Sequence, residues 1–75
     1  MPAVINVPAP YGCVVAEHFV SVGQEGEAGQ DIVMIEAMKM YNPVATPEAG
    51  TVTWLETPGV CAEEGATIAI IARRS

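Results

Sequence analysis

The two halves of this chain repeat one another, and this duplication restricts the fold more than any other feature. The segment GQEGEAGQDIVMIEA, which begins at Gly23, matches GVCAEEGATIAIIAR, which begins at Gly59, at a constant offset of 36 residues. Upstream, Gly12 followed by CVV corresponds to Gly50 followed by TVT, so the first half carries two extra residues. Neither half could bury an apolar face alone. We therefore expect two similar sheets, related by a pseudo-twofold axis, around one shared core.

Short segments rich in β-branched residues, separated by glycine and proline, predict strands throughout the chain. The strongest candidates are residues 12–20, 31–37, 50–56 and 67–72, and shorter ones are residues 3–7 and 41–46. The unbroken apolar runs IVMI and IAII predict strands that are covered on both faces, as in a small closed barrel or sandwich. No segment keeps a helical period over three turns. The whole chain, residues 1–75, is predicted to form one domain.

The charge and hydropathy patterns exclude several classes of function. The formal net charge is −6, and the only two arginines, Arg73 and Arg74, stand together at the end of the sequence. Such a surface repels phosphate backbones, which argues against nucleic-acid binding. No apolar run approaches the roughly 20 residues that a membrane-spanning helix needs, and nothing resembles a signal peptide. We expect a soluble intracellular protein without a membrane partner.

Few residues could perform catalysis or bind a metal. Cys13 and Cys61 lack the paired spacing of a zinc or redox site, so both are expected to be reduced and to behave as small apolar side chains. His18 has no catalytic partner nearby in the sequence. The glycines from Gly23 to Gly29 are not followed by a helix, as a phosphate-binding loop would be. We therefore predict no catalytic residues and no metal site.

The junction between the halves contains Lys39, the only lysine of the chain. Two-residue hairpin turns need positive φ angles, which Met38 and Lys39 do not readily adopt, yet EAMKM is too short for a stable helix. Such a conflict between local preference and context is typical of functional sites. In extended backbone, Met38 and Met40 would lie on one side and brace the hairpin, leaving the Lys39 amine free. An exposed amine suits the attachment of a prosthetic group better than catalysis, which needs a desolvated lysine.

The sequence EAMKM, residues 36–40, resembles the biotin-attachment signature of biotinyl domains, the biotin carboxyl carriers of the biotin-lipoyl attachment family. The resemblance covers nearly the whole chain, through VPAPYG, GQEGEAGQDIVMIEAMKM, PVATPEAGTV and EEGATIAII. It implies an all-β fold, a flattened β-barrel (barrel-sandwich hybrid) of two four-stranded antiparallel sheets. In that fold the attachment lysine lies on the hairpin that joins the halves.

The resemblance also implies a function. Lys39 would be biotinylated by a biotin protein ligase through biotinyl-AMP, with Ala37, Met38 and Met40 positioning it. A role for Met38 in the hydrophobic core stays open. The non-catalytic domain would then be a swinging arm that carries a carboxyl group from a biotin carboxylase to a carboxyltransferase. Its location would be the cytoplasm, or an organellar matrix if the chain belongs to a larger eukaryotic carboxylase.

Two positions in the sequence depart from the family pattern. The sequence PYG, ending at Gly12, is one residue shorter than the usual Pro-x-x-Gly spacing, and Gly26 stands where the family generally has an apolar residue.

Two alternative functions stay open. One alternative is a lipoyl-type carrier domain of a 2-oxo acid dehydrogenase-like complex, which shares the fold but usually has Asp-Lys-Ala-like surroundings. The other is an unmodified β-barrel interaction module with Tyr11 and Trp54 as contact residues.

Overall fold

The structure, a computed structural model, describes residues 3–74, and its regular elements are all strands. They are β1 (Val4–Pro8), β2 (Cys13–His18), β3 (Glu25–Gly26), β4 (Asp31–Ala37), β5 (Met40–Ala45), β6 (Gly50–Leu55), β7 (Cys61–Ala62) and β8 (Thr67–Arg73). The six longer strands match the predicted segments closely. The predicted segments do not include β3 and β7, because a strand of two residues is too short to show an alternation of polar and apolar side chains. Over residues 3–74 there is no helix that could cross a membrane.

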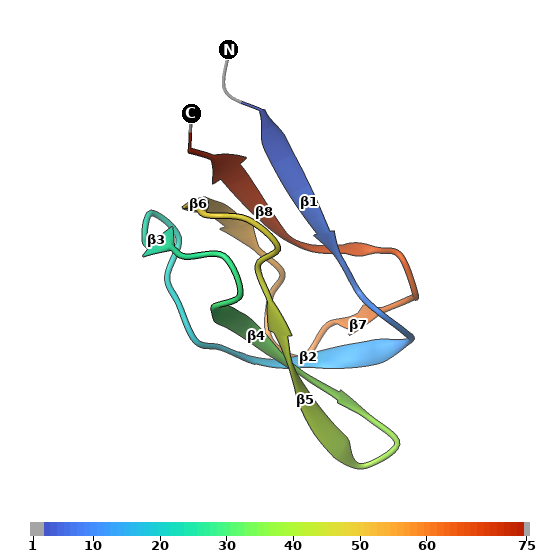
Figure 1. Cartoon of the computed structure of the whole chain (residues 1–75). Coiled ribbons are helices and arrows are strands. Elements are labelled where there is room, and N and C mark those ends of the chain that lie inside the picture. Colours follow the sequence, from blue (N-terminus) through green and yellow to red (C-terminus); the bar gives the residue numbers. More distant parts are fainter. Residues whose placement is uncertain (1–2, 75) are drawn as a thin grey trace.

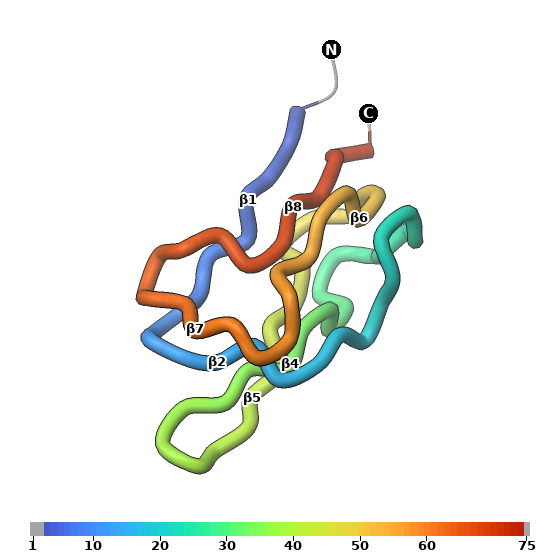
Figure 2. Tube along the Cα trace, turned by 180° about the vertical axis from the view of Figure 1, so that it is seen from behind, coloured from blue at the N-terminus to red at the C-terminus, as the bar shows by residue number. Residues whose placement is uncertain are grey.

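The strands form two four-stranded antiparallel sheets, which confirms the expected flattened barrel. One sheet has the order β1-β8-β6-β3 and the other has the order β5-β4-β2-β7. The chain crosses between the sheets several times, as its path in Figures 1 and 2 shows. The start of β1 and the end of β8 lie at one end of the molecule, and the β4–β5 hairpin protrudes at the opposite end (Figure 1). The hairpin that joins the halves therefore lies far from the start of β1 and the end of β8.

The core between the sheets consists of small and β-branched side chains. Its fully buried members include Val15, Ile32, Val33, Ile35, Val52, Ile68, Ala69 and Ile71. The prediction that the runs IVMI and IAII are covered on both faces holds only for the first part of each strand. Ile32 and Val33 are both 0% exposed, whereas Met34 is half-buried. Further along the strand the ordinary alternation returns, with one face in the core and the other toward solvent.

The glycine turns confirm the duplication. Gly23 and Gly59 have φ angles of 95° and 94°, and Gly29 and Gly65 both have φ angles of 85°. Each pair therefore makes the same left-handed turn, a conformation that glycine adopts without steric cost.

The strand register corrects the upstream part of the alignment. Val15 pairs with Ile35 in one half, and Val52 pairs with Ile71 in the other. Counting back from the two valines, Gly50 corresponds to Cys13 and not to Gly12. The first half therefore carries one extra residue rather than two. The Pro-x-x-Gly spacing is therefore not shortened in the first half. Cys13, three residues after Pro10, occupies the place that Gly50 has in the second half.

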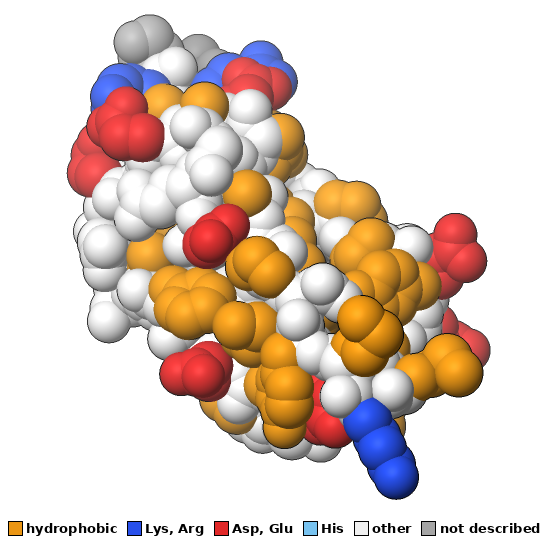
Figure 3. All heavy atoms as spheres, turned by 60° about the horizontal axis from the view of Figure 1, so that its bottom comes forward, with side chains coloured by type: hydrophobic (Ala, Val, Ile, Leu, Met, Phe, Trp, Pro, Cys, Tyr) orange, Lys and Arg blue, Asp and Glu red, His pale blue; other side chains and the backbone are white. Residues whose placement is uncertain are grey.

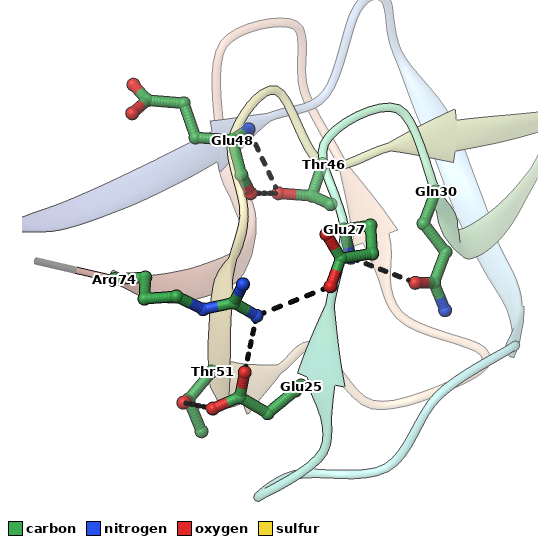
Figure 4. A network of polar contacts seen from close by, with 7 residues as sticks. All are labelled: Glu25, Glu27, Gln30, Thr46, Glu48, Thr51 and Arg74. Carbon is green, nitrogen blue, oxygen red and sulfur yellow. Dashed lines mark hydrogen bonds and ion pairs between the residues drawn. The ribbon is translucent and has the colours of Figure 1, made fainter.

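Ion pairs join Arg73 and Arg74 to glutamates of neighbouring segments, and Figure 4 shows those of Arg74. Arg74 contacts Glu25 and Glu27, which raise the pKa of its guanidinium, and Arg73 pairs with Glu48 at 2.9 Å. Figure 3 shows positively charged side chains at two opposite ends of the molecule. Lys39, the only other lysine or arginine of the sequence, lies in the turn between β4 and β5.

Candidate functional site at the β4–β5 hairpin

The hairpin turn consists of two residues, Met38 and Lys39, both in the left-handed region. Ala37 pairs with Met40 at the last step of the ladder, and the φ angles of Met38 and Lys39 are 51° and 65°. Positive φ at both central positions is the pattern of a type I′ turn, which matches the twist of the flanking strands. Within residues 3–74, these are the only residues other than glycine with positive φ. Each of these two residues loses about 1–2 kcal/mol of folding free energy relative to the same residue at negative φ.

This geometry corrects the predicted role of the methionines. The turn backbone is not extended, so the expected alternation of Met38 and Met40 against Lys39 does not occur. Met38 is 94% exposed and Met40 is 64% exposed, which also shows that the core role left open for Met38 was wrong. Lys39 is exposed at the tip between them. The three side chains thus form a projecting apolar tip with one amine.

The base of the hairpin is held from several sides. β4 lies between β2 and β5 in its sheet, and Ala37 packs against the core. On β5, the Asn42 side-chain amide donates a hydrogen bond of 2.8 Å to the Tyr11 hydroxyl in the β1–β2 loop. The base of the hairpin is therefore held in place beneath the exposed tip. Tyr11, which was considered above as a contact residue for a partner, instead bonds to the hairpin of its own chain.

A shallow groove of about 670 Å³ lies beside the hairpin. Register places Glu36, Val14 and Cys61 in one row across β4, β2 and β7, and all three line this groove. Met38 lines it from the turn, and Glu63 and Glu64 line it from the loop after β7. The groove was not predicted from the sequence, because its residues come from both halves and the two-residue strand β7 brings them together.

The two cysteines, distant in sequence, lie on the neighbouring strands β2 and β7. Cys13 pairs with Ala62 and Val14 pairs with Cys61, so the cysteine side chains face opposite sides of the sheet. Both thiols are free. Burial raises the pKa of the Cys13 thiol, and the nearby Cys61 raises it further. The expectation of apolar packing is right for Cys13, which is buried, and wrong for Cys61, which is exposed.

The two thiols should differ strongly in reactivity. At pH 8 we expect iodoacetamide to alkylate Cys61 at least about ten times faster than Cys13, since attack requires an accessible thiolate. Peptide mass mapping of a time course gives both rates in one sample. Equal rates in the native protein would contradict the burial of Cys13, and equal rates in 6 M urea are the control for intrinsic reactivity.

Relieving the turn should stabilise the fold. Met38→Gly is expected to raise the free energy of unfolding by about 1 kcal/mol, because glycine adopts positive φ freely and this exceeds its entropic cost. Urea denaturation of wild type and variant measures the change. Met40→Gly is the matched control, because position 40 lies in a strand where glycine should destabilise. A loss of stability with Met38→Gly would show that the turn is not left-handed at that residue.

Comparisons with known proteins agree with this geometry. A family model described as "Biotin-requiring enzyme" (biotin-lipoyl) matches residues 3–71. No curated protein matches the sequence. Among solved structures, the urea carboxylase of Kluyveromyces lactis superposes with a TM-score of 0.86 and 27% identity, over 92% of this chain. A single-chain, multi-domain long-chain acyl-CoA carboxylase superposes with a TM-score of 0.87 and 28% identity, over 100% of this chain. The matches span only 6% and 8% of those two proteins.

Proposed function

The chain belongs to the biotin-lipoyl family of biotin-requiring enzymes, and from this premise we propose that it is a biotin carboxyl carrier domain with biotin attached to Lys39. The observation that supports Lys39 best is its position in a two-residue turn, at positive φ, beyond the last paired residues of β4 and β5. A modifying enzyme can enclose such a tip without disturbing the sheets. The exposed amine fits a covalent acyl group, since the projecting turn leaves space around it.

The attachment step uses only the amine of this chain. The Lys39 nitrogen attacks the acyl carbonyl of biotinyl-AMP, an amide bond forms, the bond to the phosphate oxygen breaks, and AMP leaves while the amine loses a proton. A biotin protein ligase supplies the activated acyl group. The modification removes the single lysine charge, so the formal net charge changes from −6 to −7.

The carrier role follows from tethering. When bound, biotin supplies the carboxyl-accepting chemistry, and the domain itself contributes reach and a high local concentration at each partner site. The partners would be a biotin carboxylase and a carboxyltransferase, in keeping with the two carboxylases whose structures are similar. Ala37 would hold the base of the turn, and the exposed Met38 and Met40 would contact the partners. The domain would catalyse nothing itself, and would work in the cytoplasm or an organellar matrix.

Intact mass after co-expression tests the proposal. The wild-type chain is expressed with a biotin protein ligase, and in parallel with a lipoate ligase. We expect one added biotinyl group with the first enzyme and no added lipoyl group with the second. A lipoyl group, with no biotin, would establish the lipoyl-type carrier instead, and no modification by either would favour the interaction module.

A further inference from the structure

We propose that the groove beside the hairpin is a docking site for the ring system of the biotin carried by Lys39, so that the free domain keeps its cofactor folded against its own surface. This rests on the proposed function. The first argument is continuity: Glu36, Ala37 and Met38 line the groove and lead directly to Lys39. A group attached at Lys39 therefore starts at the groove's edge and needs only to turn back along the hairpin.

The size and chemistry of the groove suit that group. Its volume of about 670 Å³ lies within the range of small-molecule sites. Val14 gives it an apolar floor, and the exposed Met38 gives it a polarizable wall that can contact a thioether ring. The carboxylates of Glu36, Glu63 and Glu64 can accept hydrogen bonds from the two N–H groups of a cyclic urea.

The negative charges around the groove select for a neutral ligand over an anionic one. Arg73 and Arg74 are paired with glutamates at the far end of the molecule, and the positive charge of Lys39 disappears on acylation. Among residues 3–74, no lysine or arginine charge then remains beside these three carboxylates. They favour a neutral ligand that donates hydrogen bonds and disfavour an anionic one. The groove is therefore expected to hold the cofactor weakly in its neutral form.

Weak binding is sufficient because the ligand is tethered. A short flexible tether gives an effective concentration on the order of 1 mM, so an intrinsic dissociation constant of about 0.5 mM fills the groove two-thirds of the time. Free biotin at micromolar concentration would not fill it measurably. Only biotin attached to Lys39 would therefore occupy the groove to a measurable extent. A partner enzyme can still draw the cofactor out of the groove at a small cost in free energy.

Cys61 provides a reporter within the groove. Its exposed thiol lines the groove, so a docked ring should slow its alkylation by iodoacetamide about threefold, in proportion to the time that the groove is open. The rate is measured for the full chain with and without biotin, after intact mass has shown complete loading. Lys39→Gln is the control for charge, because it removes the ammonium group without adding a ring.

A second variant separates docking from indirect effects. Gly12 also lines the groove, and a Cβ atom built there meets nothing within 4 Å, so Gly12→Leu fills the groove without disturbing the backbone. In this variant the loaded and unloaded forms should react at equal rates, while Ser21→Leu, in the exposed β2–β3 loop, should keep the threefold difference. If loaded wild type and Lys39→Gln react equally fast, the docking proposal is overturned. Failure to load biotin would instead overturn the proposed function.

Discussion

A chain in which Lys39 is replaced by arginine will carry no biotin after co-expression with a biotin protein ligase, although its fold and stability stay the same. Arginine keeps the positive charge and is as compatible with the turn as lysine, but its guanidinium stays protonated and is not a nucleophile. Because Lys39 is exposed and is the only lysine, no other side-chain amine can substitute for it. Streptavidin blotting and intact mass should both show a complete loss, with the urea midpoint unchanged.

A position swap makes the same test sharper. The double variant Met38→Lys with Lys39→Met keeps composition, charge and both left-handed positions, and moves the amine by one residue within the turn. Because the swap moves the amine to the other position of the turn, away from the place where Lys39 presents it, we expect biotin incorporation to fall at least about tenfold. Equal loading of the swapped chain would show that the ligase needs only an exposed lysine on this hairpin. Loading of the Lys39→Arg chain would place the attachment site elsewhere.

Much of the fold could be predicted from the sequence because its signals are local and repeated. Six strands lie within apolar β-branched segments bounded by glycine and proline, and the matching glycines at 23 and 59 fix where each half turns. The hairpin joining the halves follows once the duplication is recognised. The same signals fail for β3 and β7, whose two residues pair only because the neighbouring strands are already in place.

The details of the site depend on contacts that the sequence does not encode locally. Met38 and Lys39 have poor intrinsic preference for a left-handed turn, yet the paired strands on both sides leave the chain two residues in which to reverse. That constraint exposes Met38, whereas its apolar side chain alone suggested a place in the core. The groove likewise requires Val14 from one half and Cys61 from the other, brought together by β7. Periodicity within either segment gives no indication of this neighbour.

The other large effect, on stability, is expected from substitution of Gly50, whose counterpart in the first half is Cys13. A Cβ atom built on Gly50 would stand 2.3 Å from the Ala72 carbonyl oxygen and 2.7 Å from the Ile71 side chain. Backbone cannot yield as a flexible side chain does, so Gly50→Ala must separate β6 from β8 at the edge of the core. We expect a loss of about 3 kcal/mol, and a thermal midpoint lowered by more than about 10 °C.

Gly26 is the matched control, because it is buried, lies in a strand and pairs directly with Gly50. A Cβ atom there would meet Thr46 at 3.7 Å and Gln30 at 3.8 Å, which are ordinary contacts, and its counterpart in the second half is Ala62. Gly26→Ala is therefore expected to stabilise the protein by about 0.5–1 kcal/mol, since it restricts the unfolded chain without a clash. Urea and thermal denaturation of both variants measure the contrast. If the two substitutions changed stability equally, close approach of β8 could not be the reason that glycine is needed at position 50.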